Sequence, residues 1–483
     1  MTTSAERRTS MPRVFSARGL ATLALACAGL GTACAQQDPP VAQTPRVEAA
    51  SDAIAFVGAR VVPMDREGVL DAHTVLVRDG RIVAVGPDGS VEVPDDAQRI
   101  EADGHWLMPG LAEMHGHIPG PDDAQYLDDV LFLYVSNGVT TVRNMAGDAT
   151  HPDLRDRIAA GDVLGPRLAV ATPWVSPQRV PDADAARRTV AQAQADGFDL
   201  IKLGSLEPDV YAALAEAAHA ADLPFGGHIP GSVPLEEALR ARQTSIDHFD
   251  RYTEFLVPPE ARAGAPEPGF FGSGVVGLAD AARIPEAVQR TLDAGTWNVP
   301  TLSLVEHLAS PESAEAMIAW PEMRYMPVEV RDGWVRSKHE YAAREDFQPE
   351  ATARLVELRQ QLLVALHAAG APIALGSDAP QFFNVPGFSI HHEMRMMAAA
   401  GLTPWQVLET GTVAPARYFD TPGEFGAVVP GARADLILLT ADPLADLDNV
   451  RERAGVMVAG RWLPEDEIQE RLDAIAARRA AEG

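Results

Sequence analysis

The chain has 483 residues, of which 46% are hydrophobic and 22% are charged, and its formal net charge is −28. This length and composition indicate a globular protein with more than one folding unit and exclude a largely disordered chain. The strong negative charge argues against nucleic acids and anionic membrane surfaces as partners. Only Lys202 and Lys338 are lysines among the 40 basic residues. A position that retains lysine is therefore of interest, because lysine becomes a neutral amine far more readily than arginine does.

The first 35 residues are predicted to be an export signal. Arginines precede the apolar run 19–31, and Ala33-Cys34-Ala35 follows as a cleavage site. The run is too short for a membrane span, so we expect an exported protein, periplasmic or secreted, with no transmembrane span in its mature form. Cys34 offers the alternative of a lipid anchor. Both cysteines lie in this segment, which predicts a mature chain without a disulfide.

Residues 36–52, rich in Gln, Pro and Ala, are predicted to be a flexible tether. Residues 53–105 then have the pattern of a small sheet, in which two apolar runs flank Asp79-Gly80, a strong hairpin signal. The same pattern returns in 423–465. We expect the two segments to pair into one β-sandwich that the central domain interrupts, with a C-terminal helix over 466–483.

The central region, 106–422, alternates strand-like and helix-like stretches, which predicts the α/β class and a (β/α)8, TIM-like barrel. The predicted strands are 106–117, 140–146, 167–174, 199–205, 224–228, 244–249, 298–307 and 372–378. Two insertions, 257–277 and 309–349, carry aromatic residues, and we interpret them as lids over the site. Packing against the outer wall of the barrel is the alternative.

The first central strand ends in His115-Gly116-His117. Residues i and i+2 of a strand point to the same face, so both imidazoles can reach one point and form half of a metal site. Further residues with metal-binding chemistry end later strands, where parallel barrels place their active sites: Lys202, His228, His248 and Asp378. Each has an ordinary structural explanation when taken alone. Together they predict a metal centre.

The order His-x-His, Lys, His, His, Asp on successive strands resembles the metal-dependent amidohydrolase superfamily. The Met-Pro-Gly-Leu opening at 108–111, Gly376-Ser377-Asp378-Ala379 and the stretch 430–436 resemble its imidazolonepropionase-like and prolidase-like branch. The resemblance covers nearly all of residues 53–465. It implies two divalent metal ions, one held by His115, His117 and Asp378 and one by His228 and His248, with Lys202 bridging them as a carbamate.

The flanking residues Ile201 and Leu203 independently favour a neutral Lys202 amine that carbon dioxide can capture. Zinc is the expected metal for imidazole and carboxylate ligands, with manganese, iron, cobalt and nickel as alternatives. The resemblance also implies the mechanism. A hydroxide that bridges the two metals attacks the substrate carbonyl, and Asp378 takes its proton and passes it to the departing nitrogen.

We therefore expect an exported hydrolase of C–N amide bonds that acts on a dipeptide or an N-acyl amino acid. The candidate substrate contacts are Asn144, Arg251, Tyr252, His307 and His392. Tyr252 could donate to a developing oxyanion, and Arg251 could receive a substrate carboxylate. Two alternatives stay open: a hydrolase of cyclic amides, lactones or esters on the same site, and a non-catalytic envelope protein that binds metal or solute. Assembly into a homo-oligomer is also left open.

Overall fold

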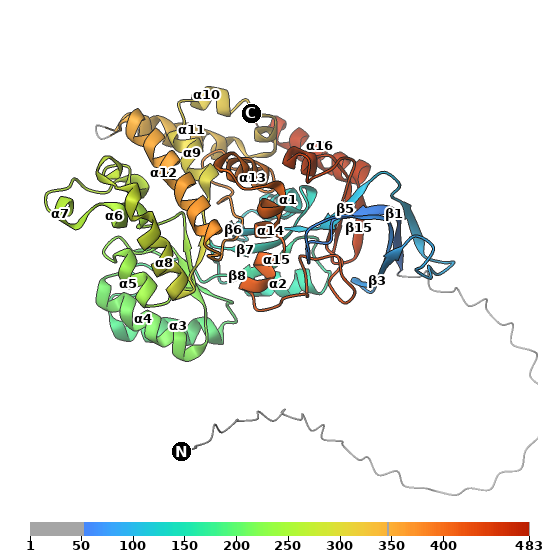
Figure 1. Cartoon of the computed structure of the whole chain (residues 1–483), viewed down its shortest axis with the longest axis horizontal. Helices are drawn as coiled ribbons and strands as arrows, with labels where there is room; N and C mark the ends of the chain where they lie inside the picture. Colours follow the sequence, from blue (N-terminus) through green and yellow to red (C-terminus); the bar gives the residue numbers. More distant parts are fainter. Residues whose placement is uncertain (1–52, 345–346, 483) are drawn as a thin grey trace, which may run out of the picture. The chain divides into compact units, whose positions relative to one another are not determined.

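The computed structural model describes residues 53–344 and 347–482 (Figure 1). The predicted export signal and tether lie outside the described residues. Within the described part of the chain, no helix combines the length and the apolar character needed to cross a membrane.

Strands from both ends of the chain form one eight-stranded sheet. They are β1 (Ile54–Val61), β2 (Leu70–Arg78), β3 (Arg81–Pro87), β4 (Gln98–Glu101), β5 (Trp106–Pro109), β13 (Leu436–Leu439), β14 (Arg453–Val458) and β15 (Arg461–Pro464). The predicted hairpin turns at Asp79 and Gly80, where φ is 51° and 70°, as two-residue hairpin loops require. The N-terminal group of strands joins the C-terminal group where β13 pairs antiparallel with β5. This pairing was predicted, whereas the described strands do not show the two packed sheets of a sandwich.

The central strands form two parallel sheets. One contains β6 (Leu111–Gly116), β7 (Val139–Asn144) and β8 (Arg167–Val170), and the other contains β9 (Ile201–Leu203), β10 (Phe225–Gly227), β11 (Ser245–Asp247) and β12 (Trp297–Val299). A parallel bridge from Ala171 to Leu200 links the two sheets. On the far side, Ile373 bridges Asn298, and the amide of Met114 donates to the carbonyl of Leu375 over 2.8 Å. The protein thus has the predicted mixed α/β character, with parallel strands.

Helices separate most of the parallel strands, and most of the other elements after β12 are also helices. They are α1 (Ala124–Ser136), α2 (His151–Ala159), α3 (Ala183–Ala195), α4 (Pro208–Ala221), α5 (Leu235–Arg240), α6 (Tyr252–Leu256), α7 (Pro259–Arg262), α8 (Ile284–Ala294), α9 (Leu302–Ala309), α10 (Ala314–Met317), α11 (Val328–Ala342), α12 (Pro349–Ala368), α13 (Ser389–Ala400), α14 (Pro404–Gly411), α15 (Val413–Tyr418) and α16 (Glu465–Ala481). Short 3-10 turns lie at Phe270–Gly272, Val276–Leu278, Ala281–Arg283, Pro321–Tyr325 and Leu447–Arg451.

The prediction of a strand over 298–307 is wrong beyond Val299. The chain turns at Thr301, whose φ is 45°, and continues as α9, so His307 lies on a helix rather than at a strand end. The carboxylate of Glu393 accepts hydrogen bonds from the amides of Leu302 and Ser303, both over 2.8 Å. This acceptor satisfies free N–H groups at the start of the helix, and it comes from a segment that is distant in sequence.

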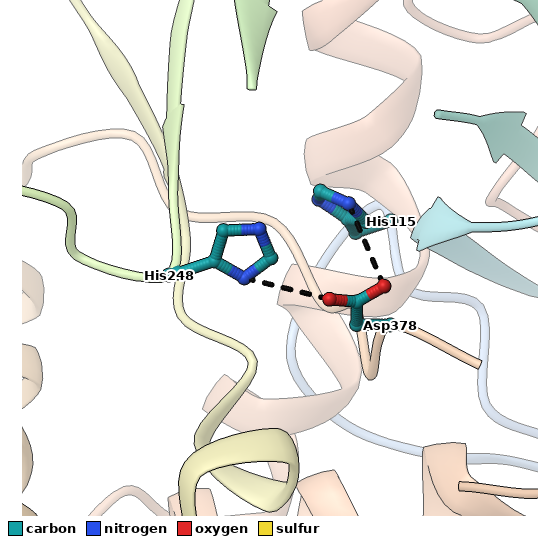
Figure 2. A group of neighbouring side chains, drawn as sticks. All are labelled: His115, His248 and Asp378. Carbon is teal, nitrogen blue, oxygen red and sulfur yellow. Dashed lines mark ion pairs between the residues drawn. The ribbon is translucent and has the colours of Figure 1, made fainter. Parts of the chain in front are cut away.

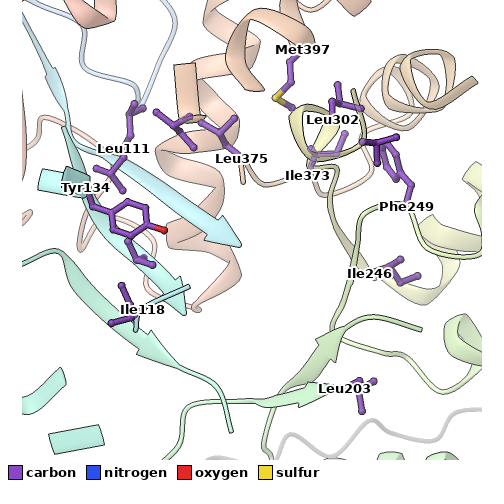
Figure 3. Close-up of a cluster of buried hydrophobic side chains, with 14 of the residues drawn as sticks. Leu111, Ile118, Tyr134, Leu203, Ile246, Phe249, Leu302, Ile373, Leu375 and Met397 are labelled. Atoms are coloured by element: carbon purple, nitrogen blue, oxygen red, sulfur yellow. The ribbon is translucent and has the colours of Figure 1, made fainter. Parts of the chain in front are cut away.

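The hydrophobic core joins the parallel strands to the surrounding helices. Leu111, Tyr134 and Leu375 lie together at one end of the cluster, while Ile246 and Phe249 belong to its other side (Figure 3). At the C-terminus, α16 is fixed to α1 by ion pairs: Arg479 donates to Asp129 over 2.7 Å, and Arg471 donates to Asp128 over 2.8 Å.

Candidate metal centre

His115, His248 and Asp378 converge from three different segments, and their side chains point toward one another (Figure 2). One potential ligand atom from each residue lies within 4.8 Å of the others. Asp378 Oδ1 is 3.7 Å from His115 Nε2, and Asp378 Oδ2 is 3.8 Å from His248 Nδ1. His117 joins the group, since its Nε2 is 2.6 Å from Asp378 Oδ1. The pair of histidines predicted from the His-x-His pattern thus shares one carboxylate.

A buried carboxylate and a buried guanidinium set the orientation of His115. Asp247 Oδ2 lies 2.6 Å from His115 Nδ1 and 2.7 Å from Arg143 Nη2. Arg143 also donates to the carbonyl of Met114 and to the hydroxyls of Ser245 and Tyr418. Because Nδ1 of His115 donates to the carboxylate, its Nε2 keeps a free lone pair, as a metal ligand needs. Burial lowers the pKa of His115 well below its usual value, as does the nearby Lys202, so the ring is neutral.

His228 and His248 form the other half of the centre, with ring centroids 4.6 Å apart. His228 Nδ1 is 2.8 Å from Asp250 Oδ2, which leaves its Nε2 free. His248 Nδ1 is 2.8 Å from the hydroxyl of Thr301. Its Nε2 is buried and has no hydrogen-bond partner among the described residues. Burial lowers the pKa of His248 well below its usual value, so this ring is also neutral.

Lys202 on β9 is 1% exposed, and its Nζ lies 3.2 Å from His115 Nε2. Gly227 on the adjacent β10 has a φ of +96°, and a Cβ at that position would come within 2.9 Å of Nζ. Glycine therefore leaves the space that the lysine occupies. Burial lowers the pKa of Lys202, against the opposing charges of Asp247 and Asp378, and so favours the neutral amine.

Left-handed backbone conformations concentrate at this centre. His248 and Asp378 have φ values of 61° and 65°, and Thr301, which contacts His248, has a φ of 45°. Such conformations cost of order 1–3 kcal/mol each for residues other than glycine, and they concentrate at functional sites. Asp378 follows a segment in which only Ile373 makes a strand bridge, so the predicted strand 372–378 is not a regular one.

A further buried acid, Glu113, connects the segment that carries His115 with the segment that carries Asp378. It accepts hydrogen bonds from the amides of His115 and Ser377, both over 2.9 Å, and from the Ser377 hydroxyl over 2.5 Å. Burial raises the pKa of Glu113 to about 8. The sequence reasoning missed Glu113, Asp247, Asp250 and Arg143. The one available signal was that Asp247 and Asp250 flank His248 in the chain.

The structure does not bring all predicted substrate contacts to this centre. The Asn144 side chain accepts hydrogen bonds from the amides of Ile118 and Ala146, so it supports the backbone after β6 and after β7. The Tyr252 hydroxyl is 2.7 Å from that of Thr291, and the residue is 1% exposed. Arg251 pairs with Glu254 over 2.8 Å and lines a cavity of about 340 Å³. His307 and His392 lie together elsewhere, with ring centroids 5.2 Å apart.

Aromatic residues flank the two halves of the centre. Trp174 is 46% exposed, and its ring centroid is 5.2 Å from that of His228. Phe271, in the first insertion, lies 5.4 Å from His248. Its neighbour Phe270 packs 5.2 Å from Tyr341 of the second insertion. The two insertions therefore touch one another next to the metal centre.

The donor set fits divalent metal ions. The two central histidines are neutral, each has a ring nitrogen available, and a carboxylate lies between them, which is the set of donors that zinc and its neighbours prefer. The unpartnered Nε2 of His248 is the strongest single sign, because buried polar atoms are nearly always satisfied.

Glu393, the acceptor at the start of α9, should also make stability depend on pH. Burial raises its pKa from 4.5 to about 7, so the folded chain binds this proton more tightly than the unfolded chain. Stability is then lost as the pH rises through that range, by about 3 kcal/mol in total. Glu393→Gln should flatten this slope, although the variant is less stable overall. Urea unfolding between pH 5 and pH 8 measures it, with the exposed Glu340→Gln as the control. An unchanged slope in Glu393→Gln would contradict the assignment.

Residues 106–463 match the model of the Amidohydrolase family. The structure is similar to that of a putative prolidase from Bifidobacterium longum, at 22% identity and a TM-score of 0.64, over 89% of this chain and 100% of the other. A Xaa-Pro dipeptidase with bound methionine is similar at 18% identity and a TM-score of 0.63, over 85% and 100%. An ochratoxinase from A. niger is similar at 16% identity and a TM-score of 0.60, over 86% and 96%. At these identities the likeness is one of fold.

Shorter segments are similar to curated proteins. Adenine deaminase 1 of Jannaschia sp. is 43% identical over 61 residues, 13% of this chain and 10% of that protein. A dihydroorotase of Bacillus cereus is 30% identical over 97 residues, 20% of this chain and 22% of that protein. The chain thus matches only a minor part of the length of these relatives.

Proposed function

This chain belongs to the Amidohydrolase family, and from that premise we propose that it is a binuclear metal-dependent hydrolase of C–N amide bonds, with a dipeptide or an N-acyl amino acid as its substrate. The observation that carries the proposal is the convergence of neutral His115 and His248 on Asp378 beside a buried lysine. We also propose that the two parallel sheets and segment 373–379 close into the eight-stranded barrel that places these residues at one end.

In this proposal His115, His117 and Asp378 would hold one divalent ion, and His228 and His248 would hold the second. Lys202 would supply an anionic ligand as a carbamate, because its neutral amine can add to carbon dioxide with loss of a proton. Bound ions would polarise the substrate carbonyl and lower the pKa of a water molecule toward neutrality. Zinc is the favoured metal, since imidazole and carboxylate are its usual ligands.

Asp378 is the group that moves the proton. Its two oxygens face His117 and His248, so the carboxylate lies between the two halves of the centre. From there it can accept a proton from the attacking water and return it to the departing amine nitrogen. In this proposal the rings of Trp174 and Phe271, which lie next to His228 and His248, provide apolar contacts for a substrate side chain.

Hydrolysis of a cyclic amide, a lactone or an ester on the same residues is the second candidate. It is favoured by the similarity of one segment to a dihydroorotase, a relative whose name denotes a different substrate. The six residues would serve either class, because both require attack on a carbonyl carbon.

Amine release from the purified mature protein, loaded with zinc or manganese, tests the proposal on a panel of dipeptides and N-acyl amino acids. Loss of amine release in Asp378→Asn is the expected result, and metal analysis of the variant reports whether the ion assigned to His115, His117 and Asp378 is retained. Near-normal turnover in that variant would refute the role of Asp378. If no amine is released from any member of the panel while two metals are bound, the second candidate is favoured. If cyclic amides and esters are not hydrolysed either, a metal-binding protein without catalysis is favoured.

We further propose that residues 1–35 direct export. N-terminal sequencing and fractionation of the producing cells test this. A mature chain that starts after Ala35 in the periplasm or medium is expected, whereas a lipid-modified Cys34 at the N-terminus would establish the anchored alternative.

A further inference from the structure

A second cavity, of about 330 Å³, lies between α9, the segment 310–320, α12 and α13, and none of its lining residues belongs to the metal centre. We call it the α9–α13 cavity and propose that it binds a small organic ammonium ion, that is, a primary amine on a short apolar stem. Its volume is in the range of small-molecule sites. The inference does not depend on the proposed hydrolase activity.

The first observation is an unsatisfied buried imidazole. His307 lines the cavity and is 3% exposed, and its Nδ1 has no hydrogen-bond partner among the described residues. The helix that carries it is fixed, because Lys338 Nζ donates to the carbonyl of His307 over 2.6 Å. Burial lowers the pKa of His307 well below its usual value, so the ring is neutral. The wall of the cavity therefore contains a neutral imidazole that does not repel a cation.

The second observation is a carboxylate beside it. Glu306 lines the same cavity and is half-buried, and in the described part of the chain its carboxylate makes no hydrogen bond or ion pair. Burial raises the pKa of Glu306, and the nearby His392 offsets only part of that effect. An ammonium group would add a charge-assisted hydrogen bond to this carboxylate.

The third observation is the aromatic wall. Trp320 packs against both His307 and His392, with ring centroids 4.9 Å and 5.1 Å away. Its indole N–H donates to Glu312 over 3.1 Å, which fixes the orientation of the ring. An indole face beside a carboxylate attracts organic cations by a cation–π interaction. The lining residues Met317 and Met396 provide apolar contacts for a short stem.

The charged residues that line the cavity favour a cationic ligand over an anionic one. Glu306 and Glu312 line the cavity, and the lining His392 is paired with Glu322 over 2.9 Å. The lining cation Arg395 is exposed and faces Asp448 at 3.7 Å. A carboxylate ligand would therefore meet like charges, whereas an ammonium ion meets a free carboxylate and a neutral imidazole.

Isothermal titration calorimetry on the metal-loaded mature chain tests the proposal with n-butylammonium chloride, and with 1-butanol and sodium butyrate as probes that lack the ammonium group. We expect saturable binding of n-butylammonium at one site and no binding of the other two. Absence of n-butylammonium binding, or equal binding of 1-butanol, would overturn the proposal.

Two variants locate the binding. Glu306→Gln and Trp320→Leu should each weaken n-butylammonium binding by about tenfold or more, as the loss of a charge-assisted contact implies. Glu329→Gln, an exposed acid on α11 that does not line the cavity, should bind as the wild type does. Binding that persists unchanged in both cavity variants would place the amine elsewhere, for instance at the metal centre, and would refute this site.

Discussion

Replacing Lys202 by methionine is expected to lower kcat/KM for the preferred amide by about a thousandfold or more while the chain stays folded. The reason is that the carbamate proposed for Lys202 cannot form on methionine, and a loss of several kcal/mol of electrostatic stabilisation corresponds to this change in rate. Stability should be equal or higher, because the buried amine is replaced by an apolar side chain of similar length. Steady-state kinetics, metal analysis and thermal unfolding measure the three effects.

The other lysine provides the matched control. Lys338 donates to the carbonyls of His307 and Ser310 and is absent from the metal centre, so Lys338→Met should cost stability and leave the metal content unchanged. In Lys202→Ala, formate or acetate should restore part of the activity, because a small carboxylate can replace the missing anion. Two bound metals together with kcat/KM within tenfold of the wild type in Lys202→Met would refute the carbamate.

Asp247→Asn should weaken metal binding by about 10- to 100-fold and lower the free energy of unfolding by about 3–5 kcal/mol. Both effects come from one carboxylate oxygen, which holds His115 in the required tautomer and balances the fully buried Arg143. Without its charge, the guanidinium is left buried beside Lys202, which is itself buried. Competition with a chromophoric chelator measures the affinity, and urea unfolding of the metal-free protein measures the stability.

Asp250→Asn distinguishes the effect on metal affinity from the effect on the free energy of unfolding. Asp250 supports His228 in the same manner, but it is 9% exposed and has no described ion pair with an arginine. Its variant should therefore lose metal affinity with little loss of stability. If Asp247→Asn bound both metals with wild-type affinity, the role assigned to Asp247 would be wrong.

Local sequence patterns were enough to predict which candidate metal ligands lie at the ends of strands. Alternating apolar runs placed His115, His228 and His248 at or just beyond strands, because side-chain direction in a strand depends on near neighbours. The same reasoning failed for His307, since the apolar residues of 302–309 suit a buried strand or a buried helix equally well. The turn at Thr301 and the distant acceptor Glu393 decided between them.

The sequence by itself determined the parallel α/β character, the pairing of the two chain ends in one sheet and the identity of the residues that meet at Asp378. These follow from periodicity and from the chemistry of each side chain. Only the tertiary structure decided which carboxylate supports which histidine. Asp247 neighbours His248 in the chain, yet it bonds His115 across 132 positions. The physical reason is that a hydrogen bond inside the core depends on which strands lie side by side, and that packing is set by long-range contacts that no local pattern contains.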